Sequence, residues 1–493
     1  MELELIIPFI SYFLIVIGIS VFTAKFSSKG ISEYFLADRK LNYFVVGLSS
    51  VVSGRSAWLM LGFTGLAYMI GFSAIWSVLG YIIVELILFL YLAPKFRDYT
   101  EKHDCITIPD FFAARFNDTN GFLRITVAAI LMLFMTAYIA AQFVAGGKAF
   151  STYFEITPTI GIIITAIIVL IYTTLGGFWA ASLNEVLQAV FMLLAIIGVL
   201  FFGIVNVGGW EVISLELSDA PQINSLGNVF ANTEGDFLNP FAISIIGALG
   251  AVGIGLGSAG SPYMLVRYMS IKNSTQFKWT AIAGTVWNIL LAAGALLIGL
   301  VGRAYISNVE GIPQKDVENI FLALAENLLN PNLMIFIGVV LAVIFAAIMS
   351  SANSQLLIAA SAVVRDIYQK IVKRNQDEIE ETQLALLSRF VVILFVVLSV
   401  LLGIWLQDLV FWIILFAWAG FGASIGTTLL LAIFWKPTNK SGVIAGLFSG
   451  TITVVFWKLT PALSAIIYEL IPAFFVSLTF TIIVSLLTNK NSK

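Results

Sequence analysis

Residues 49–56, Ser-Ser-Val-Val-Ser-Gly-Arg-Ser, interrupt an otherwise apolar stretch at 42–70 with small and polar side chains. Residues 253–262, Gly-Ile-Gly-Leu-Gly-Ser-Ala-Gly-Ser-Pro, interrupt a second such stretch at 239–268. Such residues in mid-membrane leave backbone groups without intrahelical partners, which is tolerated where they line a cavity or bind a ligand. The two segments therefore predict two broken helices around one binding site. Close packing through small residues such as Gly257 is the alternative.

The composition of the chain indicates a membrane protein. Its 493 residues are 60% hydrophobic and 11% charged, with a mean hydropathy of +0.99. A protein surface of this composition would be insoluble in water, so the solvent of this chain is lipid. Stretches of about 20 apolar residues recur and predict thirteen spanning helices. They are expected near 5–24, 42–70, 73–93, 122–149, 157–175, 184–206, 239–268, 276–302, 333–362, 385–405, 408–435, 441–458 and 463–487.

Charged and metal-ligating residues exclude several classes of protein. The net charge is −2 and the basic residues are scattered, so nucleic acid is not an expected partner. The single cysteine, Cys105, and the single histidine, His103, permit no internal disulfide and no Cys/His metal cluster, and both are expected in a solvated loop. No catalytic constellation converges on one span, so an enzyme is not expected. No cofactor or obligatory protein partner is evident, and the expected partners are a small solute and membrane lipid.

The basic residues predict the orientation of the chain. They cluster in alternate loops, at Lys25, Lys29, Arg39 and Lys40, at Lys95, Arg97 and Lys102, at Arg267, Lys272 and Lys278, and at Arg365, Lys370, Lys373 and Arg374. Residues 207–238, on the other side, contain no Lys or Arg. Basic loops stay in the cytoplasm, so we expect a multi-pass protein of the bacterial inner (plasma) membrane with its N-terminus outside and its C-terminus inside. The acidic start of the chain predicts no cleavable signal peptide, so the first helix is retained.

The spacing of the two interruptions predicts an internal symmetry. Five spans separate them, which suits a five-plus-five inverted repeat within one transmembrane domain. We expect an extra N-terminal helix and loop at 1–41, a first repeat at 42–206, a second repeat at 239–435 and two further helices at 436–493.

Five short motifs occur in order along the chain. They are Ile31-Ser32-Glu33-Tyr34-Phe35, Trp58-Leu59-Met60-Leu61-Gly62, Leu175-Gly176-Gly177-Phe178, Met349-Ser350-Ser351 and Ala417-Trp418-Ala419-Gly420-Phe421-Gly422. Together they resemble the sodium/solute symporter family, and its bacterial sodium/proline symporters most of all. The similarity runs from about residue 30 to 470. It implies a leucine-transporter type of fold that works by alternating access, with the solute bound at mid-membrane between the broken helices.

The resemblance also implies an ion site. In the family, sodium is held by carbonyls of the first broken helix, here Val52 and Arg55, and by the Ala347 carbonyl and the Ser350 and Ser351 hydroxyls. Hard oxygen ligands suit this cation. Residues three and four apart share a helix face, so the last three are neighbours. Hydrogen bonds from these serines back to their own helix are the alternative.

Two residues depart from the proline-transporting members, because Gly54 replaces an aspartate and Arg55 replaces a neutral residue. A charge at mid-bilayer costs at least about 2.5 kcal/mol and needs a partner or water. We expect the guanidinium of Arg55 to occupy the ion site, which would make transport independent of sodium. A side chain turned away from the ion site, or one reaching along a water-filled vestibule, is the alternative. Glu85 and Glu185 are the candidate charge partners, unless Glu85 is protonated.

We expect six residues to line the solute cavity. They are Trp58, Tyr138, Gln142, Ser258, Pro262 and Ser354. Aromatic faces would flank an apolar body while amide and hydroxyl groups fix its orientation, although ordinary helix packing explains the aromatic residues equally well. Proline symporters carry an aromatic pair where this chain has Ile254 and Ser258, so another amino acid, a monocarboxylate or a small zwitterion is equally open.

The expected function is secondary transport of a small organic solute by alternating access. A sodium-coupled symporter of the proline type, with Arg55 turned away, is one alternative. A membrane solute sensor that acts through a non-covalent partner is an alternative of another class. A fused sensor is not expected, since only six residues follow the last predicted span.

Overall fold

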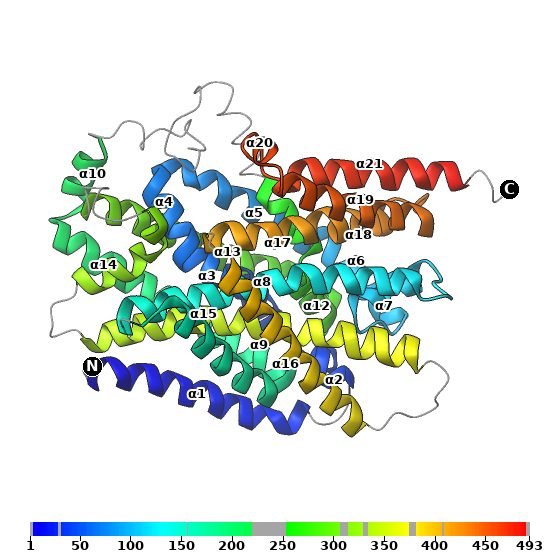
Figure 1. Ribbon diagram of the computed structural model, residues 1–493, viewed down its shortest axis with the longest axis horizontal. Coiled ribbons are helices and arrows are strands. Elements are labelled where there is room, and N and C mark those ends of the chain that lie inside the picture. The colour runs from blue at the N-terminus through cyan, green and yellow to red at the C-terminus, as the bar shows by residue number, and fades with distance from the viewer. Residues whose placement is uncertain are drawn as a thin grey trace.

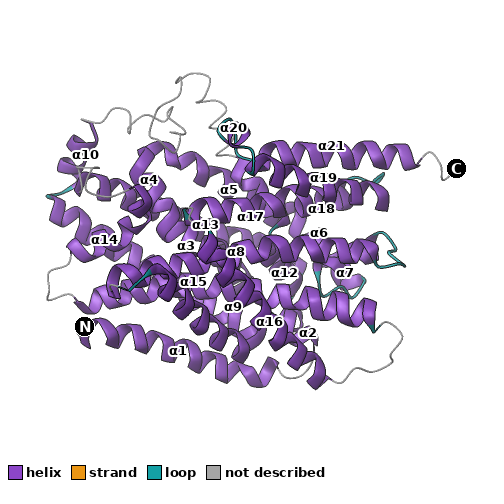
Figure 2. Ribbon diagram, viewed as in Figure 1, coloured by secondary structure: helices purple, strands orange, loops and turns teal. Residues whose placement is uncertain are grey.

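The structure, a computed structural model, describes residues 3–27, 31–154, 156–218, 253–305, 314–328, 334–373, 381–406 and 409–489. Every regular element in these ranges is a helix, as Figure 2 shows. The prediction of an all-helical fold is confirmed. The α-helices are α1 (Leu3–Ser27), α2 (Ile31–Leu36), α3 (Tyr43–Ala57), α4 (Thr64–Ile70), α5 (Ile75–Ile87), α6 (Ala93–Lys102), α7 (Ile108–Arg115), α8 (Phe122–Phe154), α9 (Pro158–Val207), α10 (Trp210–Ser218), α12 (Pro262–Ser270), α13 (Phe277–Tyr305), α14 (Ile320–Leu328), α15 (Met334–Ser361), α16 (Glu381–Trp405), α17 (Val410–Gly420), α18 (Thr427–Phe434), α19 (Lys440–Lys458), α20 (Pro461–Ser464) and α21 (Leu470–Asn489).

Short segments of tighter or wider helix join these elements. The 3-10 segments are η1 (Ala37–Arg39), η3 (Gly71–Ala74), η5 (Ile254–Gly260), η6 (Ser274–Gln276) and η8 (Gln314–Asn319). The π-helical segments are η2 (Trp58–Phe63), η4 (Leu88–Leu92), η10 (Ala362–Val372) and η11 (Phe421–Gly426). Irregular helix of this kind often marks functional sites.

The described helices agree in position with the predicted spans. Nine of them are long and apolar enough to cross a membrane, and two shorter apolar ones cover Ile7–Thr23 and Pro158–Ile171. The spans predicted at 157–175 and 184–206 are the two arms of α9, which bends at Gly177 where φ is 58°. A positive φ suits glycine, which explains this residue at the bend. The exact number of thirteen spans and the five-plus-five repeat stay predictions, and much of the span predicted at 239–268 lies outside the described residues.

Both predicted interruptions are present in the structure. Helix α3 leaves helical geometry at Ser56, where ψ is −154°, and continues as η2. Segment η5 ends in an extended residue, Ser261, before Pro262 starts α12. The close-packing alternative also holds for part of this segment. A Cβ on Gly260 would collide with the carbonyl of Phe421 in η11, so only glycine lets the two backbones approach this closely.

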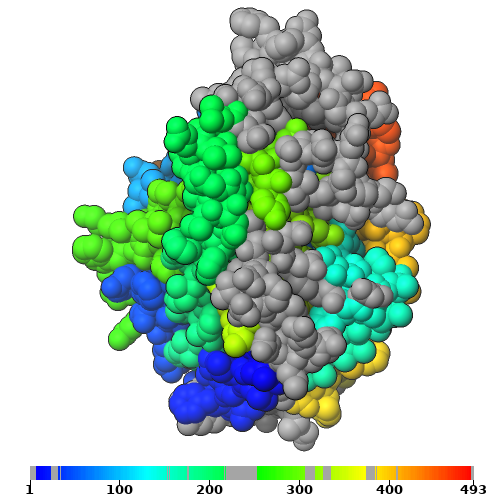
Figure 3. Space-filling view, turned by 90° about the vertical axis from the view of Figure 1, so that its left-hand side faces the viewer, coloured from blue at the N-terminus to red at the C-terminus, as the bar shows by residue number. Residues whose placement is uncertain are grey.

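Helix α1 begins and helix α21 ends on opposite sides of the helical body (Figure 1). Helices α10 and α14 lie on the side where α1 begins, and α7 lies on the side where α21 ends. From the side where α1 begins, the green surface near α10 lies above the blue surface of the first helix (Figure 3). Helix α1 packs on α9 and α15, while α19 and α21 pack against each other. The side with α7 carries the loops that are predicted to be cytoplasmic.

A compact polar junction ties the α7 side together. The Arg39 guanidinium donates to the carbonyls of Met269, Thr100 and Cys105, at 3.1, 3.1 and 2.7 Å. Cys105 is 1% exposed, so its predicted place in a solvated loop is wrong, while His103 is exposed as predicted. Sequence could not reveal this burial, because it comes from contacts with helices that are distant along the chain.

Candidate functional site

The break in α3 is the centre of a buried polar site. Helix α8 presents two side chains to it, since Tyr138 and Gln142 are four residues apart and share a face. The Ser56 hydroxyl lies 3.3 Å from the Tyr138 hydroxyl and accepts from Gln142 Nε2 at 3.2 Å. The Tyr138 hydroxyl also donates to the Ser53 carbonyl at 3.4 Å. The predicted residues of α8 therefore meet the unwound turn.

An aromatic cluster covers the site on the side toward η2. The Trp58 ring stacks on Phe63, Phe411 and Trp418, with centroids 5.7, 5.7 and 5.9 Å apart, and meets Tyr81 edge-on at 5.7 Å. Trp58 is 1% exposed, so this conformation closes the site from water on that side. Stacked rings of this kind could hold the apolar body of a solute.

Arg55 and Glu85 form a fully buried ion pair beside the aromatic cluster. Arg55 Nη2 lies 2.6 Å from both carboxylate oxygens, and the residues are 0% and 2% exposed. Asn288 of α13 accepts from Arg55 Nε at 2.9 Å and donates to Glu85 at 2.7 Å. Ser258 of η5 donates to Glu85 at 3.0 Å. The Arg55 guanidinium carbon lies over the Tyr81 ring, 3.6 Å from its centroid.

This network joins four separate segments of the chain. Its members come from α3, α5, η5 and α13, which lie in the first two predicted spans of each predicted repeat. Each Glu85 oxygen accepts two hydrogen bonds, so the carboxylate is fully satisfied. Of the two candidate charge partners, Glu85 is therefore the one that Arg55 contacts. Full satisfaction is what allows a buried ion pair to persist.

The Arg55 side chain lies away from the predicted ion ligands. The Ser351 hydroxyl donates to the Ser53 carbonyl at 3.0 Å, and the Ser350 hydroxyl donates to the Ala347 carbonyl of its own helix at 3.1 Å. Within the described ranges, the hydrogen bonds of the guanidinium go instead to Glu85, Asn288 and, weakly, the Gly54 carbonyl. The expected guanidinium among the serine hydroxyls is therefore not what the structure has. Glu85 and Asn288 hold it by hydrogen bonds instead.

Glu185, the other candidate partner, pairs with Arg267. Arg267 Nη2 lies 2.5 Å from both Glu185 oxygens, and both side chains are 0% exposed. Ser53 and Ser354 donate to the same carboxylate at 2.6 and 2.7 Å. The interpretation of Arg267 as a basic residue of a cytoplasmic loop is wrong, because Glu185 compensates its charge inside the protein.

The six predicted cavity residues are all buried, but they do not form one ring. Tyr138 and Gln142 meet at the α3 break, and Trp58 lies in the aromatic cluster beside it. Pro262 begins α12 directly after the second break. Ser258 belongs to the Arg55 network and Ser354 to the Glu185 network. Five further residues belong to the two networks and the aromatic cluster but are not among the predicted site residues. They are Ser53, Tyr81, Arg267, Asn288 and Trp418. Asn288 could have been suspected as a polar residue inside an apolar span.

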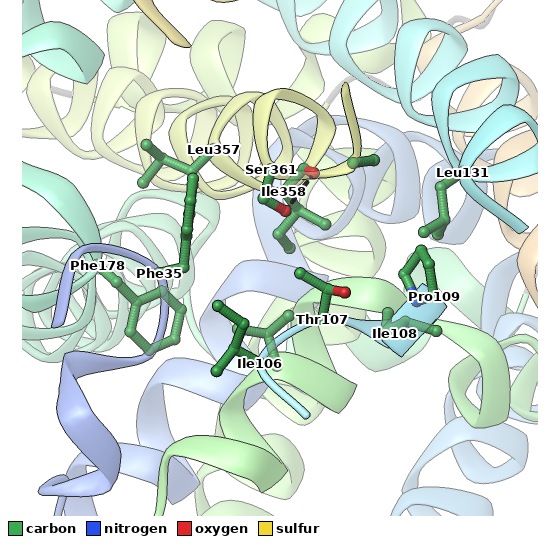
Figure 4. A pocket seen from close by; sticks show the side chains of 12 residues that line it. Phe35, Ile106, Thr107, Ile108, Pro109, Leu131, Phe178, Leu357, Ile358 and Ser361 are labelled. Carbon is green, nitrogen blue, oxygen red and sulfur yellow. Dashed lines mark hydrogen bonds between the residues drawn. The ribbon is translucent and has the colours of Figure 1, made fainter. Parts of the chain in front are cut away.

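A mostly apolar pocket lies next to the Glu185 network, toward the α7 side. Figure 4 shows it between Thr107, Phe178 and Leu357. The Phe178 ring lies 5.6 Å from the Arg267 guanidinium, and Leu357 is three residues beyond Ser354 on α15. The Glu185 network therefore stands between this pocket and the α3 break.

A separate ion pair, between Glu318 and Lys148, closes the side of the site away from α7. The Glu318 carboxylate of η8 accepts from Lys148 at 2.5 Å and from the backbone N–H groups of Val410 and Phe411 at 3.0 and 2.9 Å. These N–H groups form the first turn of α17 and have no partners within their helix. Phe411 is the residue that stacks on Trp58. This Glu318 link therefore connects η8, which follows α13 in the chain, to the first turn of α17 and so to the aromatic cluster.

Metal ligands of the His, Cys, Asp and Glu kind are not grouped in the described ranges, where no cluster of three or more occurs. An alkali cation would rely on carbonyl and hydroxyl oxygens instead. Those oxygens are what the α3 break and α15 bring together, through the contact of Ser351 with Ser53.

Comparison with known proteins identifies the family. The sequence profile of the Sodium:solute symporter family matches residues 34–450. The chain belongs to the sodium:solute symporter family. It is 35% identical to the osmoregulated proline transporter OpuE of Bacillus subtilis (strain 168), over 100% of this chain and 96% of the relative. It is 33% identical to a sodium/proline symporter of Staphylococcus aureus (strain JH9), over 97% of this chain and 92% of the relative. The chain is therefore a transporter and not an enzyme.

Solved structures show the same fold at low sequence identity. A Na⁺-coupled sialic acid symporter in a substrate-bound, outward-open state superposes with a TM-score of 0.79 at 18% identity, covering 99% of this chain and 97% of that one. The nucleobase-cation-symport-1 family transporter Mhp1 superposes with a TM-score of 0.57 at 13% identity, covering 92% and 94%. The resemblance in sequence motifs and the fold therefore agree.

Proposed function

We propose that this protein couples the entry of a small amino-acid-like solute, with proline as the first candidate, to the entry of sodium. The two relatives named above are described as a proline transporter and a sodium/proline symporter. The observation that carries the sodium coupling is the position of Arg55. Its charge is engaged by Glu85 and Asn288, so it does not compete with a cation for the hydroxyls of α15.

The ion is proposed to bind where α15 faces the α3 break. Its ligands are the carbonyls of Val52, Arg55 and Ala347 with the hydroxyls of Ser350 and Ser351. The Ser351 hydroxyl already lies against the backbone of α3, 3.0 Å from the Ser53 carbonyl. Rotation of the two serine hydroxyls toward a bound ion would exchange their hydrogen bonds to the Ala347 and Ser53 carbonyls for ligation, since hydroxyl groups are free to turn.

The solute is proposed to bind at the α3 break next to the ion site, between Trp58, Tyr138, Gln142 and Ser258, with Pro262 at the end of the cavity. The rings supply apolar faces and the amide and hydroxyl groups fix orientation. Ser354 is assigned to the Glu185 network instead. Its contact with Arg267 at 3.0 Å makes it part of the barrier toward the α7 side.

Alternating access is proposed to open these two barriers in turn. The Glu318 link closes one side and the Glu185 network closes the other, so the structure resembles an occluded state with both closed. The apolar pocket beside Glu185 lies on the side of the basic loops, and we assign this side to the cytoplasm. The chain would then lie in a bacterial plasma membrane with its N-terminus outside and its C-terminus inside.

The test is uptake of radiolabelled proline into proteoliposomes, with an inward sodium gradient or with potassium in its place. We expect sodium to stimulate uptake by the parent, and Ser351→Ala to raise the sodium concentration needed for half-maximal uptake at least about tenfold. Ser449→Ala is the matched control, since this serine bonds to its own helix at Gly446. Equal uptake without sodium would contradict the coupling. Proline binding without uptake would favour the solute sensor.

A further inference from the structure

One edge of the Arg55 guanidinium, at Nη1, makes almost no hydrogen bonds within the network with Glu85 and Asn288. Its Nε and Nη2 groups are taken by Asn288 and Glu85. Nη1 carries two further N–H donors, and among the described residues its one hydrogen-bond partner is the Gly54 carbonyl at 3.5 Å, the limit of a hydrogen bond. The network thus holds a charged group rigidly while one edge of it stays available.

Other buried donors without partners belong to side chains near Arg55. The hydroxyls of Tyr81 and Tyr263 and the Nε1 groups of Trp58 and Trp418 are buried and have no hydrogen-bond partner in the part of the chain that the structure describes. The Arg55 guanidinium lies 3.6 Å from the Tyr81 ring centroid and 5.8 Å from that of Trp418. Buried polar groups are normally satisfied, so a cluster of unpaired donors points to a ligand that brings acceptors.

The Tyr263 hydroxyl belongs to the same cluster. A Cβ placed on Gly54 would lie 2.9 Å from this hydroxyl, which therefore approaches the chain directly beside Arg55. Its ring lies 6.3 Å from that of Tyr138 at the α3 break. The cluster of unpaired donors thus reaches the site proposed for the solute.

The same site offers one unpaired acceptor. Gln142 Oε1 is buried and bonds to no described residue, while its Nε2 donates to Ser56. Unpaired donors near Arg55 and an unpaired acceptor on α8 match a solute that carries an anion at one end and a protonated amine at the other.

We propose that Arg55 binds the carboxylate of the solute through Nη1, with the tryptophan Nε1 groups and tyrosine hydroxyls as further donors. Glu85 and Asn288 are positioning residues that fix the guanidinium and balance its charge. Since that charge is already neutralised, the solute brings its own cation, which faces Gln142. The site therefore selects zwitterions with one carboxylate. This inference rests on the proposed function and adds the group that the transporter recognises.

A buried ion pair serving only as a structural brace would show none of this selectivity. The distinguishing measurement uses proline and prolinamide, which differ in the carboxylate alone. Each is titrated against radiolabelled proline bound to the purified protein in saturating sodium, and the ratio of their half-inhibitory concentrations is recorded. Charge-assisted hydrogen bonds predict that the parent favours proline by at least about tenfold.

Two variants assign the selectivity to Arg55. The double variant Arg55→Met/Glu85→Gln removes both charges together, so no unpaired charge stays buried. Arg55→Lys keeps the charge but replaces the planar fork with a single ammonium. We expect the ratio to fall at least about fivefold in both variants. Arg124→Met is the control, because it removes a half-buried arginine that pairs with Asp110 and Asp366, outside this site, and it should leave the ratio unchanged.

The possible results separate this inference from the proposed function. Equal inhibition of the parent by proline and prolinamide, with sodium-driven proline uptake intact, would overturn the inference alone. A ratio that stays at the parent value in both Arg55 variants would also overturn it. A parent that neither binds nor transports proline would contradict the proposed function, and the inference would fall with it.

Discussion

The Ser53 hydroxyl lies 2.6 Å from a Glu185 carboxylate oxygen, which joins the broken helix α3 to the second arm of α9. The Ser53 carbonyl accepts from Ser351 on α15. One residue of the break therefore touches both the proposed ion site and the barrier toward the α7 side. Binding of an ion at Ser351 would change the surroundings of Ser53. Glu185 would be affected as well, because Ser53 contacts it directly.

Removal of one member of the Glu185 and Arg267 pair should be strongly destabilising. We expect Arg267→Met to lower the free energy of unfolding by about 3–5 kcal/mol, since it leaves a buried carboxylate without its counter-charge. The double variant Glu185→Gln/Arg267→Met should recover most of this loss. Thermal unfolding in detergent measures both. Glu101→Gln is the control, because Glu101 pairs with Arg97 but is 62% exposed, and its effect should stay below about 1 kcal/mol. A double variant as unstable as the single one would contradict the argument.

Sequence could predict the two breaks because the residues there conflict with their surroundings. Small and polar residues such as Ser53 and Gly257 within an apolar run are best explained by a helix that is broken at that point. The partner of Arg55 could not be predicted in the same way. Glu85 and Glu185 were both acceptable, and the choice depends on the rotation of each helix about its axis. The sequence alone places Arg267 in a loop, because hydropathy counts a paired charge like a free one.

The labelling pattern of introduced cysteines tests the orientation. We expect a membrane-impermeant maleimide to label Glu211→Cys from outside in intact cells, and Asn117→Cys only after the cells are opened, because basic loops stay in the cytoplasm. Both positions are exposed in the structure. The reverse pattern would overturn the proposed orientation.

The native Cys105 should give little background in that experiment. Burial, with Asp110 adding to it, raises the pKa of the Cys105 thiol to about 12. A raised thiol pKa keeps the group protonated over the whole range below it, and the thiolate is the reactive form. Maleimide labelling of the parent should therefore stay low from pH 7 to 9, a range over which the reactivity of an ordinary thiol rises steeply. Rapid labelling of the parent at pH 8 would show that this region opens.

Two substitutions test the proposed solute cavity. Trp58→Ala removes the ring at the centre of the aromatic stack, and Ser258→Trp inserts bulk beside Glu85 where the native side chain is 0% exposed. We expect each to lower kcat/KM for uptake at least about tenfold, while the amount of protein in the membrane stays near that of the parent. Trp405→Ala, at a residue that is 78% exposed, is the control. Unaltered uptake in both variants would remove the proposed cavity.

The Glu318 link should hold the side of the molecule near α10 closed. Glu318→Ala removes the acceptor of the Val410 and Phe411 N–H groups and leaves Lys148 unpaired. Loss of a helix cap costs about 0.5–2 kcal/mol. Glu318→Gln keeps an acceptor oxygen for the N–H groups and loses only the charge, so it should cost less.

Phe411 stacks on Trp58, so loosening the start of α17 should also open a path to the aromatic cluster. A cysteine introduced at Val410, which is 0% exposed in the parent, reports this path. We expect an external maleimide to label Val410→Cys faster in the Glu318→Ala background than in the Glu318→Gln background, and slowest with Glu318 intact. Equal rates in all three would show that the link does not control access from this side.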